Sequence, residues 1–165
     1  MSQLHIEKEC VIQRSPDVCR AHFLDFEHHI AHGVHAGVHY TVLERQGAKQ
    51  KVRSKFKVYG LPKVDEIWVH ADAEGRVVQE FVKGDFAGGR IVVRFEPQGS
   101  GTHLVATLDV PLRGLNRLIR PILRRVVDAL TEQAIAEDRR DLESGYQPPE
   151  VRAAQRETPN AASAA

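Results

Sequence analysis

The chain has 165 residues, enough for one domain with a proper core and too few for two. Its 23 lysines and arginines nearly balance 22 aspartates and glutamates, and a net charge of +1 argues against a dedicated nucleic-acid binder. Cys10 and Cys19 form no metal-binding spacing and favour a reducing compartment. With no signal peptide and no apolar run of 18 residues, the sequence predicts a soluble cytoplasmic protein.

The N-terminal part predicts one strand followed by two short helices. Residues 5–13 alternate loosely between apolar and polar side chains, which suits a strand. Ser15, Pro16 and Asp17 then supply an N-cap, a proline at the first helical position and an acid in the first turn. Gly33 suits the end of the second helix.

From His39 onward the pattern has a period of two, which predicts antiparallel strands separated by short turns. Gln46 and Gly47 form the first of these turns. Gly84 and the pair Gly88-Gly89 mark a bulge or turn further on. With the first strand, the expected set makes a seven-stranded sheet, the later strands covering residues 40–45, 49–59, 64–72, 77–83, 90–95 and 103–110.

Residues 116–144 form the one long amphipathic helical pattern of the sequence. We expect Ile119, Ile122, Val126 and Leu130 to face the sheet from this helix. Pro121 lacks a backbone donor, so the helix is either kinked there or begins with Pro121 in its first turn.

Arginines gather where this helix begins, although a helix N-terminus prefers anions. Two interpretations are open: a solvated face, or a basic surface for an anionic membrane or an acidic partner. The residues concerned are Arg113, Arg117, Arg120 and Arg124. The proline-, alanine- and arginine-rich residues 147–165 show no core pattern, so we expect a domain over residues 1–146 and a disordered tail.

This order of elements resembles the START-like, helix-grip superfamily (SRPBCC, or Bet v 1-like). The resemblance implies an α+β fold in which a curved antiparallel sheet wraps the C-terminal helix, with two short helices closing one end. It also implies an apolar cavity for lipids, polyketides or other hydrophobic molecules. Whether the face of the strand that carries Glu66, Trp68 and His70 is concave or convex stays open. The expected ligand-binding residues are Trp68, Phe56, Phe81, Phe95, Ile122, Val126 and Leu130.

Five of the nine histidines lie between His28 and His39. The segment from Asp25 to His32 is similar to the iron motif in the catalytic domain of Rieske-type oxygenases, Asp-x2-His-x4-His. Asp25 and His28 match it, whereas His32 comes one residue early and Gly33 takes the second ligand position. A histidine pair at i, i+4 with one carboxylate suits Fe(II) or Zn. The expected metal ligands are Asp25, His28, His32 and His35, with Glu137 as a distant acid.

Two functions follow as hypotheses. One is the binding of a hydrophobic small molecule in the cavity, which needs apolar walls and a few polar anchors. The other is an enzyme in the same cavity, working either by cyclase-like acid/base chemistry through histidine or by metal-dependent chemistry like that of non-haem iron oxygenases. The histidines from 28 to 39 are alternatively residues that line or gate the cavity, or surface residues without a specific role.

Overall fold

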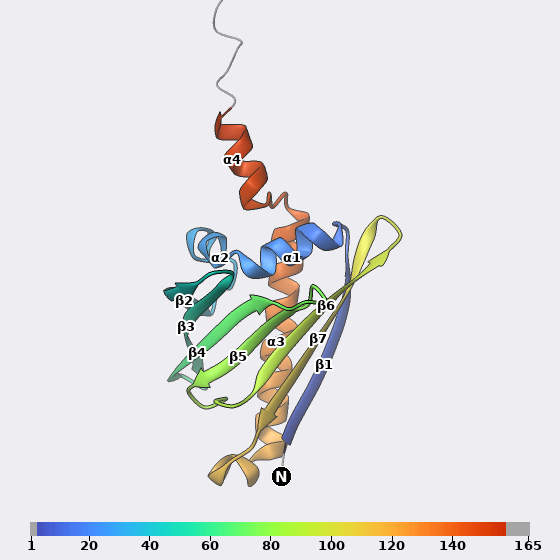
Figure 1. Cartoon of the computed structure of the whole chain (residues 1–165). Coiled ribbons are helices and arrows are strands. Elements are labelled where there is room, and N and C mark those ends of the chain that lie inside the picture. Colours follow the sequence, from blue (N-terminus) through green and yellow to red (C-terminus); the bar gives the residue numbers. More distant parts are fainter. Residues whose placement is uncertain (1–2, 158–165) are drawn as a thin grey trace, which may run out of the picture.

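Seven strands form one curved antiparallel sheet in the computed structural model, and a long helix lies along its concave face (Figure 1). The structure describes residues 3–157, apart from the side chains of Leu115 and Glu157. The predicted fold class and the number of strands are confirmed. In chain order the elements are β1 (Gln3–Ile12), α1 (Pro16–Leu24), α2 (Phe26–His32), β2 (Val38–Gln46), β3 (Lys49–Val58), β4 (Leu61–Ala71), β5 (Val77–Lys83), β6 (Arg90–Gln98), β7 (Gly101–Pro111), the 3-10 helix η1 (Gly114–Arg117), α3 (Arg120–Glu143) and α4 (Pro149–Glu157).

The strand order is β1-β7-β6-β5-β4-β3-β2, so all neighbours except β1 and β7 are consecutive in sequence. Alternate side chains point into the concave face, which explains the period of two in the sequence. A register shift at Glu66 and Ile67, opposite the end of β5, bends the sheet near Gly84. The sheet thus curves around α3 and leaves its concave face as the wall of an interior space.

The two short helices lie across one end of the gap between the sheet and α3 (Figure 1). Ser15 precedes α1 in an extended conformation, and Pro16 occupies its first turn, as predicted. The side chain of Asp25 caps α2 by accepting a hydrogen bond from the backbone N–H of His28 at 3.1 Å. Gly33 ends α2 with a left-handed φ of 58°, a conformation that glycine adopts without a steric penalty.

The helix α3 begins later than predicted, at Arg120 instead of residue 116, and Pro121 stands in its first turn. Of the two alternatives for Pro121, the structure therefore has the one without a kink. Val127, Ile135 and Leu142 are the buried apolar residues of α3. The expectation that Ile119 and Ile122 face the sheet is wrong: they are 38% and 56% exposed and lie at the N-terminal end of the helix, ahead of Val127, its first buried residue.

The C-terminal residues include a further helix, so the expectation of disorder from residue 147 is wrong for part of the tail. Residues 149–157 form α4, and Arg152 of α4 contacts Asp25 and His28. Pro149 is the first residue of this helix, since proline fits a first helical turn. The last residues of the predicted tail, 158–165, lie outside the described part of the chain.

Two groups of buried side chains make up the core. One lies under α1 and α2, where Ile12, Phe23 and Leu104 meet Leu142 and Tyr146. The other joins β1 and β7 to Val127 of α3. The ion pairs of Lys8 with Asp128 (2.9 Å) and Glu132 (3.2 Å) hold α3 against β1. Among the described residues, no helix combines the length and the apolar character that a membrane crossing requires.

Candidate functional site: a cavity and a buried histidine cluster

A cavity of about 370 Å³ lies between the concave face of the sheet and α3. Its walls are mainly apolar, with Phe56, Phe81 and Val93 on the sheet and Leu130 and Ala134 on the helix. Phe81 and Phe86 meet edge to face at 5.6 Å between ring centroids on one side of it. The curvature of the sheet creates this space, because α3 touches the edge strand β1 closely while the strands on the other side stand away from it.

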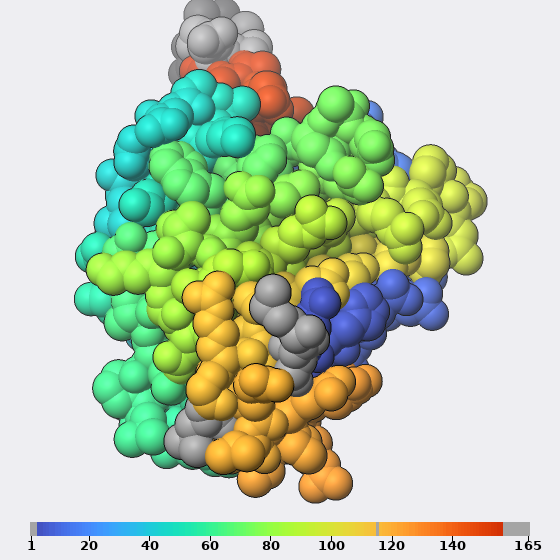
Figure 2. Space-filling model, turned by 60° about the horizontal axis from the view of Figure 1, so that its bottom comes forward, coloured from blue at the N-terminus to red at the C-terminus, as the bar shows by residue number. Residues whose placement is uncertain are grey.

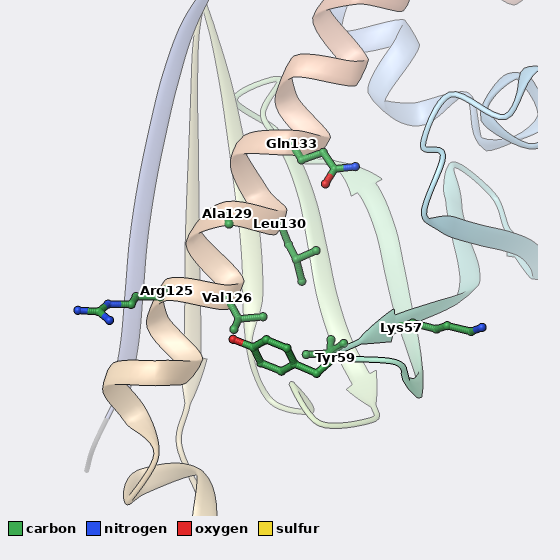
Figure 3. Close-up of a pocket in the computed structure, with 8 residues that line it drawn as sticks. Lys57, Tyr59, Arg125, Val126, Ala129, Leu130 and Gln133 are labelled. Atoms are coloured by element: carbon green, nitrogen blue, oxygen red, sulfur yellow. The ribbon is translucent and has the colours of Figure 1, made fainter.

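A groove of about 310 Å³ opens between α3 and the end of β3 (Figure 3). Lys57, Leu130 and Gln133 line both the groove and the cavity, so the groove is the entrance. The ring of Tyr59, which is 80% exposed and has a positive φ of 50°, lies below Val126 at this entrance.

The sheet contributes a polar patch to the cavity wall, formed by Ser54, Asp65 and Gln79. Ser54 and Asp65 face each other across β3 and β4. Asp65 is 2% exposed, and its Oδ1 has no hydrogen-bond partner among the described residues. Burial raises the pKa of Asp65 to about 6, against backbone N–H groups of Asp85 and Phe86 that lower it. A carboxyl group that changes charge near neutral pH thus lines a mainly apolar space.

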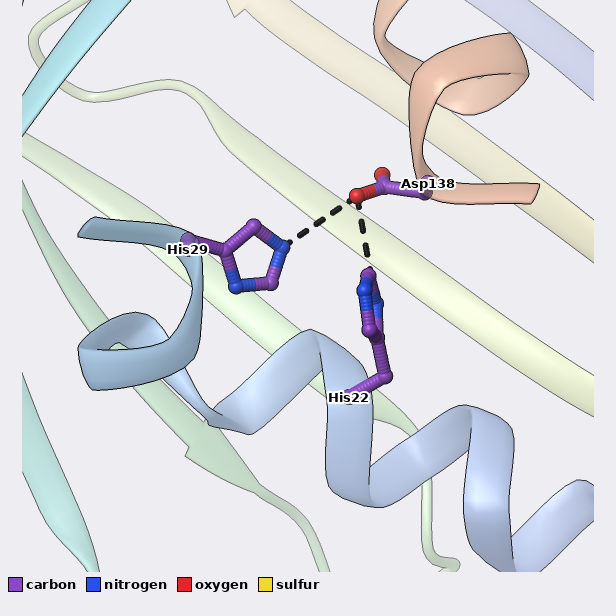
Figure 4. Close-up of side chains that lie close together, drawn as sticks. All are labelled: His22, His29 and Asp138. Atoms are coloured by element: carbon purple, nitrogen blue, oxygen red, sulfur yellow. Dashed lines mark hydrogen bonds and ion pairs between the residues drawn. The ribbon is translucent and has the colours of Figure 1, made fainter. Parts of the chain in front are cut away.

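Beneath α1 and α2 the cavity ends at three histidines that surround one carboxylate. We call His22, His29, His35 and Asp138 the histidine cluster. His29 Nε2 and His35 Nε2 each lie 3.2 Å from Asp138 Oδ1, and His22 Nδ1 lies 3.9 Å from the same oxygen. Figure 4 shows His22 of α1 and His29 of α2 pointing toward Asp138 of α3. All four side chains are buried, and His29, His35 and Asp138 line the cavity.

In each histidine of the cluster, the other ring nitrogen lies within hydrogen-bond distance of a second acceptor. His22 Nε2 lies 2.9 Å from Asp141 Oδ2, and His35 Nδ1 lies 3.0 Å from Glu137 Oε2. His29 Nδ1 lies 2.9 Å from the backbone carbonyl oxygen of Asp25. These contacts fix the ring orientations, so the nitrogens that face Asp138 are held in place before anything binds.

The histidines differ in their affinity for protons. Burial lowers the pKa of His22 to about 4, because it outweighs the attraction of Asp138 and Asp141. Burial also disfavours protonation of His35, but the charges and hydrogen bonds of Asp138 and Glu137 outweigh it and raise the pKa of His35 to about 9. The pKa of Asp138 is well below its usual range despite its burial, because His35 and His29 surround it. These histidines therefore favour the carboxylate form of Asp138.

No protein-family model matches the sequence, and no curated protein sequence matches it significantly. Solved structures do match. A protein from Thermus thermophilus has a TM-score of 0.72 at 20% identity, over 87% of this chain and 99% of that one. The Zhui aromatase/cyclase from a Streptomyces species has a TM-score of 0.74 at 16% identity, over 86% and 94%. A START superfamily protein from Mycobacterium smegmatis has a TM-score of 0.69 at 18% identity, over 85% and 97%.

The chain has the helix-grip fold. The match spans nearly the whole length of each of these proteins, and the long helix, the curved sheet and the two short helices are all present. Identities of 20% and below establish the fold only, so the position of the ligand and the chemistry must be argued from the residues of this chain.

The residues predicted to bind a ligand fall into three groups. Phe56, Phe81 and Leu130 line the helix-grip cavity, and Val126 and Leu130 line its entrance. Three others lie elsewhere, which corrects their expected position. Trp68 lies on the convex face with Glu66, beside Lys51 and Glu80 on the neighbouring strands. Phe95 lies on the concave side but packs edge-on against Phe23 of α1, at 5.5 Å between centroids, and Ile122 is exposed.

The predicted metal ligands are only partly brought together. The carboxylate of Asp25 caps α2 and accepts from Tyr146 and Arg152, so it is occupied. The ring of His28 lies between Asp141 and Arg152. His32 stacks on His28 at 4.4 Å but is exposed, because α2 ends there. Of the four expected ligands only His35 belongs to the histidine cluster, and Glu137 reaches the cavity as expected.

Sequence reasoning missed His22, His29 and Asp138 as one group. Their elements are far apart in sequence, and only the closing of α1 and α2 over α3 joins them. One signal existed: Glu137, Asp138 and Asp141 interrupt the apolar stripe of the long helix, on the face that packs against the histidine-bearing helices. Buried acids of this kind need partners, and histidines are the partners that the rest of the chain offers.

The arginine-rich end of α3 stands apart from the cavity. Arg113, Arg117, Arg120 and Arg124 are all exposed, together with Leu118, which is 79% exposed. Figure 2 shows this end of the molecule, with η1 and the beginning of α3 in orange at the surface. The exposure fits both interpretations made from the sequence, and an anionic membrane or acidic partner stays a prediction.

Proposed function

We propose that this protein binds a hydrophobic small molecule, of lipid, polyketide or aromatic type, in the cavity between the sheet and α3. The observation that carries the proposal is the cavity itself: about 370 Å³, walled mainly by aromatic and aliphatic side chains and open at one groove. This volume lies in the range of small-molecule sites, roughly 300–1,000 Å³. The fold supports the proposal, since the solved structures that share it include a START superfamily protein and an aromatase/cyclase.

The polar groups of the cavity narrow the class of ligand. Asp65, Ser54 and Gln79 form one patch on the sheet, and His35 with Glu137 forms another at the inner end. A purely hydrocarbon ligand would leave Asp65 Oδ1 without a hydrogen-bond partner, which costs free energy. A ligand with an apolar body and a hydroxyl or carbonyl group along its length pairs with Asp65 and is favoured.

Asp65 also favours a second function, acid/base catalysis on the bound molecule. Its pKa of about 6 lies near neutral pH, where a carboxyl group can both give and take a proton. It lines the cavity, and its Oδ1 has no partner in the described part of the chain. If a ligand turns over, Asp65→Asn should abolish turnover while binding is kept.

Binding can be tested with matched substitutions on α3. Ala134 lines the cavity, whereas Ala136, two residues on, is exposed. A panel of fatty acids and fused-ring phenols is titrated against the protein by calorimetry and by displacement of an environment-sensitive dye. We expect at least one compound to bind with a micromolar Kd, about −8 kcal/mol. Ala134→Phe should weaken that binding at least about tenfold by filling the space, and Ala136→Phe should leave it unchanged.

Two results would refute the proposal. One is that folded parent protein, checked by circular dichroism, binds no compound of the panel. The other is that Ala134→Phe and Ala136→Phe bind equally well, which would place the ligand outside the cavity.

A further inference from the structure

We propose that the histidine cluster is a binding site for a divalent transition-metal ion, held by His22 Nδ1, His29 Nε2 and a carboxylate oxygen of Asp138, with His35 Nε2 as the fourth donor. The donor atoms of His22, His29 and Asp138 lie within 4.8 Å of one another. His35 Nε2 approaches the same carboxylate oxygen to 3.2 Å. The site stands independently of the hydrophobic ligand proposed above.

The hydrogen bonds around the cluster assign protons to the outer ring nitrogens. The carbonyl oxygen of Asp25 can only accept, so His29 Nδ1 carries the hydrogen. The carboxylate of Asp141 likewise accepts from His22 Nε2. Histidines that ligate metals in proteins almost always donate their other N–H to a carboxylate or a backbone carbonyl in this way.

In the neutral rings, which are the forms that bind metals, the inner nitrogens of His22 and His29 then carry lone pairs that point at a carboxylate. A lone pair and a carboxylate oxygen repel each other unless a positive charge lies between them. His22 Nδ1 is fully buried and has no hydrogen-bond partner among the described residues. A cation among these atoms would satisfy all of them at once. His35 Nε2 can bind the metal only after it has lost its hydrogen, so a proton and the metal compete for this nitrogen.

A second group of possible ligands in the same region behaves differently. His22, His28 and Asp141 are also close together. Here, however, Arg152 donates toward His28 Nδ1, so His28 Nε2 carries the hydrogen and donates to Asp141 at 2.7 Å. Asp141 therefore accepts two N–H groups and each contact is satisfied. This contrast assigns the metal to Asp138 and gives Asp141 the role of orienting His22.

The donor set indicates the kind of metal. Three imidazole nitrogens and one carboxylate oxygen suit Zn²⁺, Co²⁺ or Fe²⁺ better than Mg²⁺ or Ca²⁺, which prefer oxygen. His29, His35 and Asp138 line the cavity and His22 does not. The metal site would thus border the cavity on the side of His29, His35 and Asp138.

The test uses full-length, tag-free protein reconstituted with Zn²⁺ or Co²⁺ and dialysed. We expect one metal per chain by mass spectrometry, and a visible d–d spectrum of Co²⁺ in a site of low symmetry. His29→Gln and Asp138→Asn should each weaken metal binding by more than about 100-fold, since removing a ligand costs more than the 10–100-fold lost with an outer partner. Asp141→Asn should fall within that smaller range. His32→Gln is the matched control and should bind like the parent, because His32 is exposed outside the cluster.

X-ray absorption of the Zn²⁺-loaded parent requires no variant, so it tests the proposal even if a substitution impairs folding. We expect two or three imidazoles bound to zinc. The proposal is overturned if dialysed parent retains no stoichiometric metal, if the spectrum shows no imidazole, or if His29→Gln binds the metal as tightly as the parent does.

Discussion

The guanidinium group of Arg152 lies 2.7 Å from Oδ2 of Asp25, so that α4 is tied to the junction between α1 and α2. The same carboxylate accepts from the hydroxyl of Tyr146 at 3.1 Å and from the backbone N–H of His28 at 3.1 Å. Asp25 is buried, so its charge depends on these donors. The C-terminal helix therefore helps to hold the two helices that close the cavity.

Replacing Arg152 by glutamine should reduce the free energy of unfolding by about 1–3 kcal/mol, because the buried Asp25 carboxylate loses a charged donor. Urea denaturation monitored by circular dichroism measures the change. Arg156→Gln is the control, since Arg156 is exposed on the same helix. Equal stability of the two variants would show that the contact with α4 contributes nothing in solution.

Asp65 should make stability depend on pH. Its pKa in the folded protein, about 6, is above the ordinary value of 3.8, so the folded state holds the proton more tightly than the unfolded chain. The stability that this provides is present below about pH 4 and is lost as the pH rises through 6. Relative to the parent, Asp65→Asn should therefore gain up to about 3 kcal/mol between pH 4 and pH 7. Unfolding in urea across this pH range checks it, and a constant difference would contradict it.

The neighbouring valines of α3 should differ in their contribution to stability. Val127 is 4% exposed and packs against β1 and β7, whereas Val126 is only half-buried at the entrance groove. Val127→Ala should cost about 1–3 kcal/mol through lost burial and the space it leaves. Val126→Ala should cost clearly less. Thermal and urea unfolding of both variants measure the two losses in stability. A larger loss for Val126→Ala than for Val127→Ala would mean that the helix is rotated on the sheet.

Gly84 should tolerate no side chain. Its φ is +104°, and a Cβ atom would collide with Asp65 Oδ1 and lie 2.6 Å from the backbone oxygen of Val64. Gly84→Ala should therefore destabilise the protein by more than about 2 kcal/mol, measured by urea unfolding. Gly99, with a φ of +59° and nothing within 4 Å, gives the matched control. Gly99→Ala should cost only about 1 kcal/mol for the left-handed backbone; equal losses at both positions would mean that the bulge rearranges.

The sequence was sufficient for the fold because the fold depends on periodicity. Alternation from His39 onward defines half-buried strands, and the apolar stripe after residue 116 defines the one helix that can cover them. The periodicity does not define which residues of that helix face the sheet. Its stripe is broad enough to include Ile122 and Val127 alike, and only packing against β1 and β7 selects Val127.

The site was less predictable, because its geometry depends on contacts between distant segments. Trp68 lies in a strand whose two faces both carry large side chains. The alternation of side chains along this strand therefore does not decide which of its faces is concave. The histidine segment suggested neighbouring ligands at helical spacing, yet α2 has only seven residues and turns His32 outward. Asp138 meets His22 and His29 across more than a hundred positions, a distance at which no local pattern carries information.

The pairing of β1 with β7 has a consequence for biosynthesis. Residues 3–12 find their strand partners only in residues 102–111, so the N-terminal strand has no place in the sheet until about two thirds of the chain has left the ribosome. The hairpins from β2 to β6 can form earlier, because each strand follows its partner directly. Closing the long loop between β1 and β7 is entropically costly and comes late, which makes folding slow for a domain of this size. Until then β1 is an unpaired strand edge that a nascent chain must keep from associating with its neighbours.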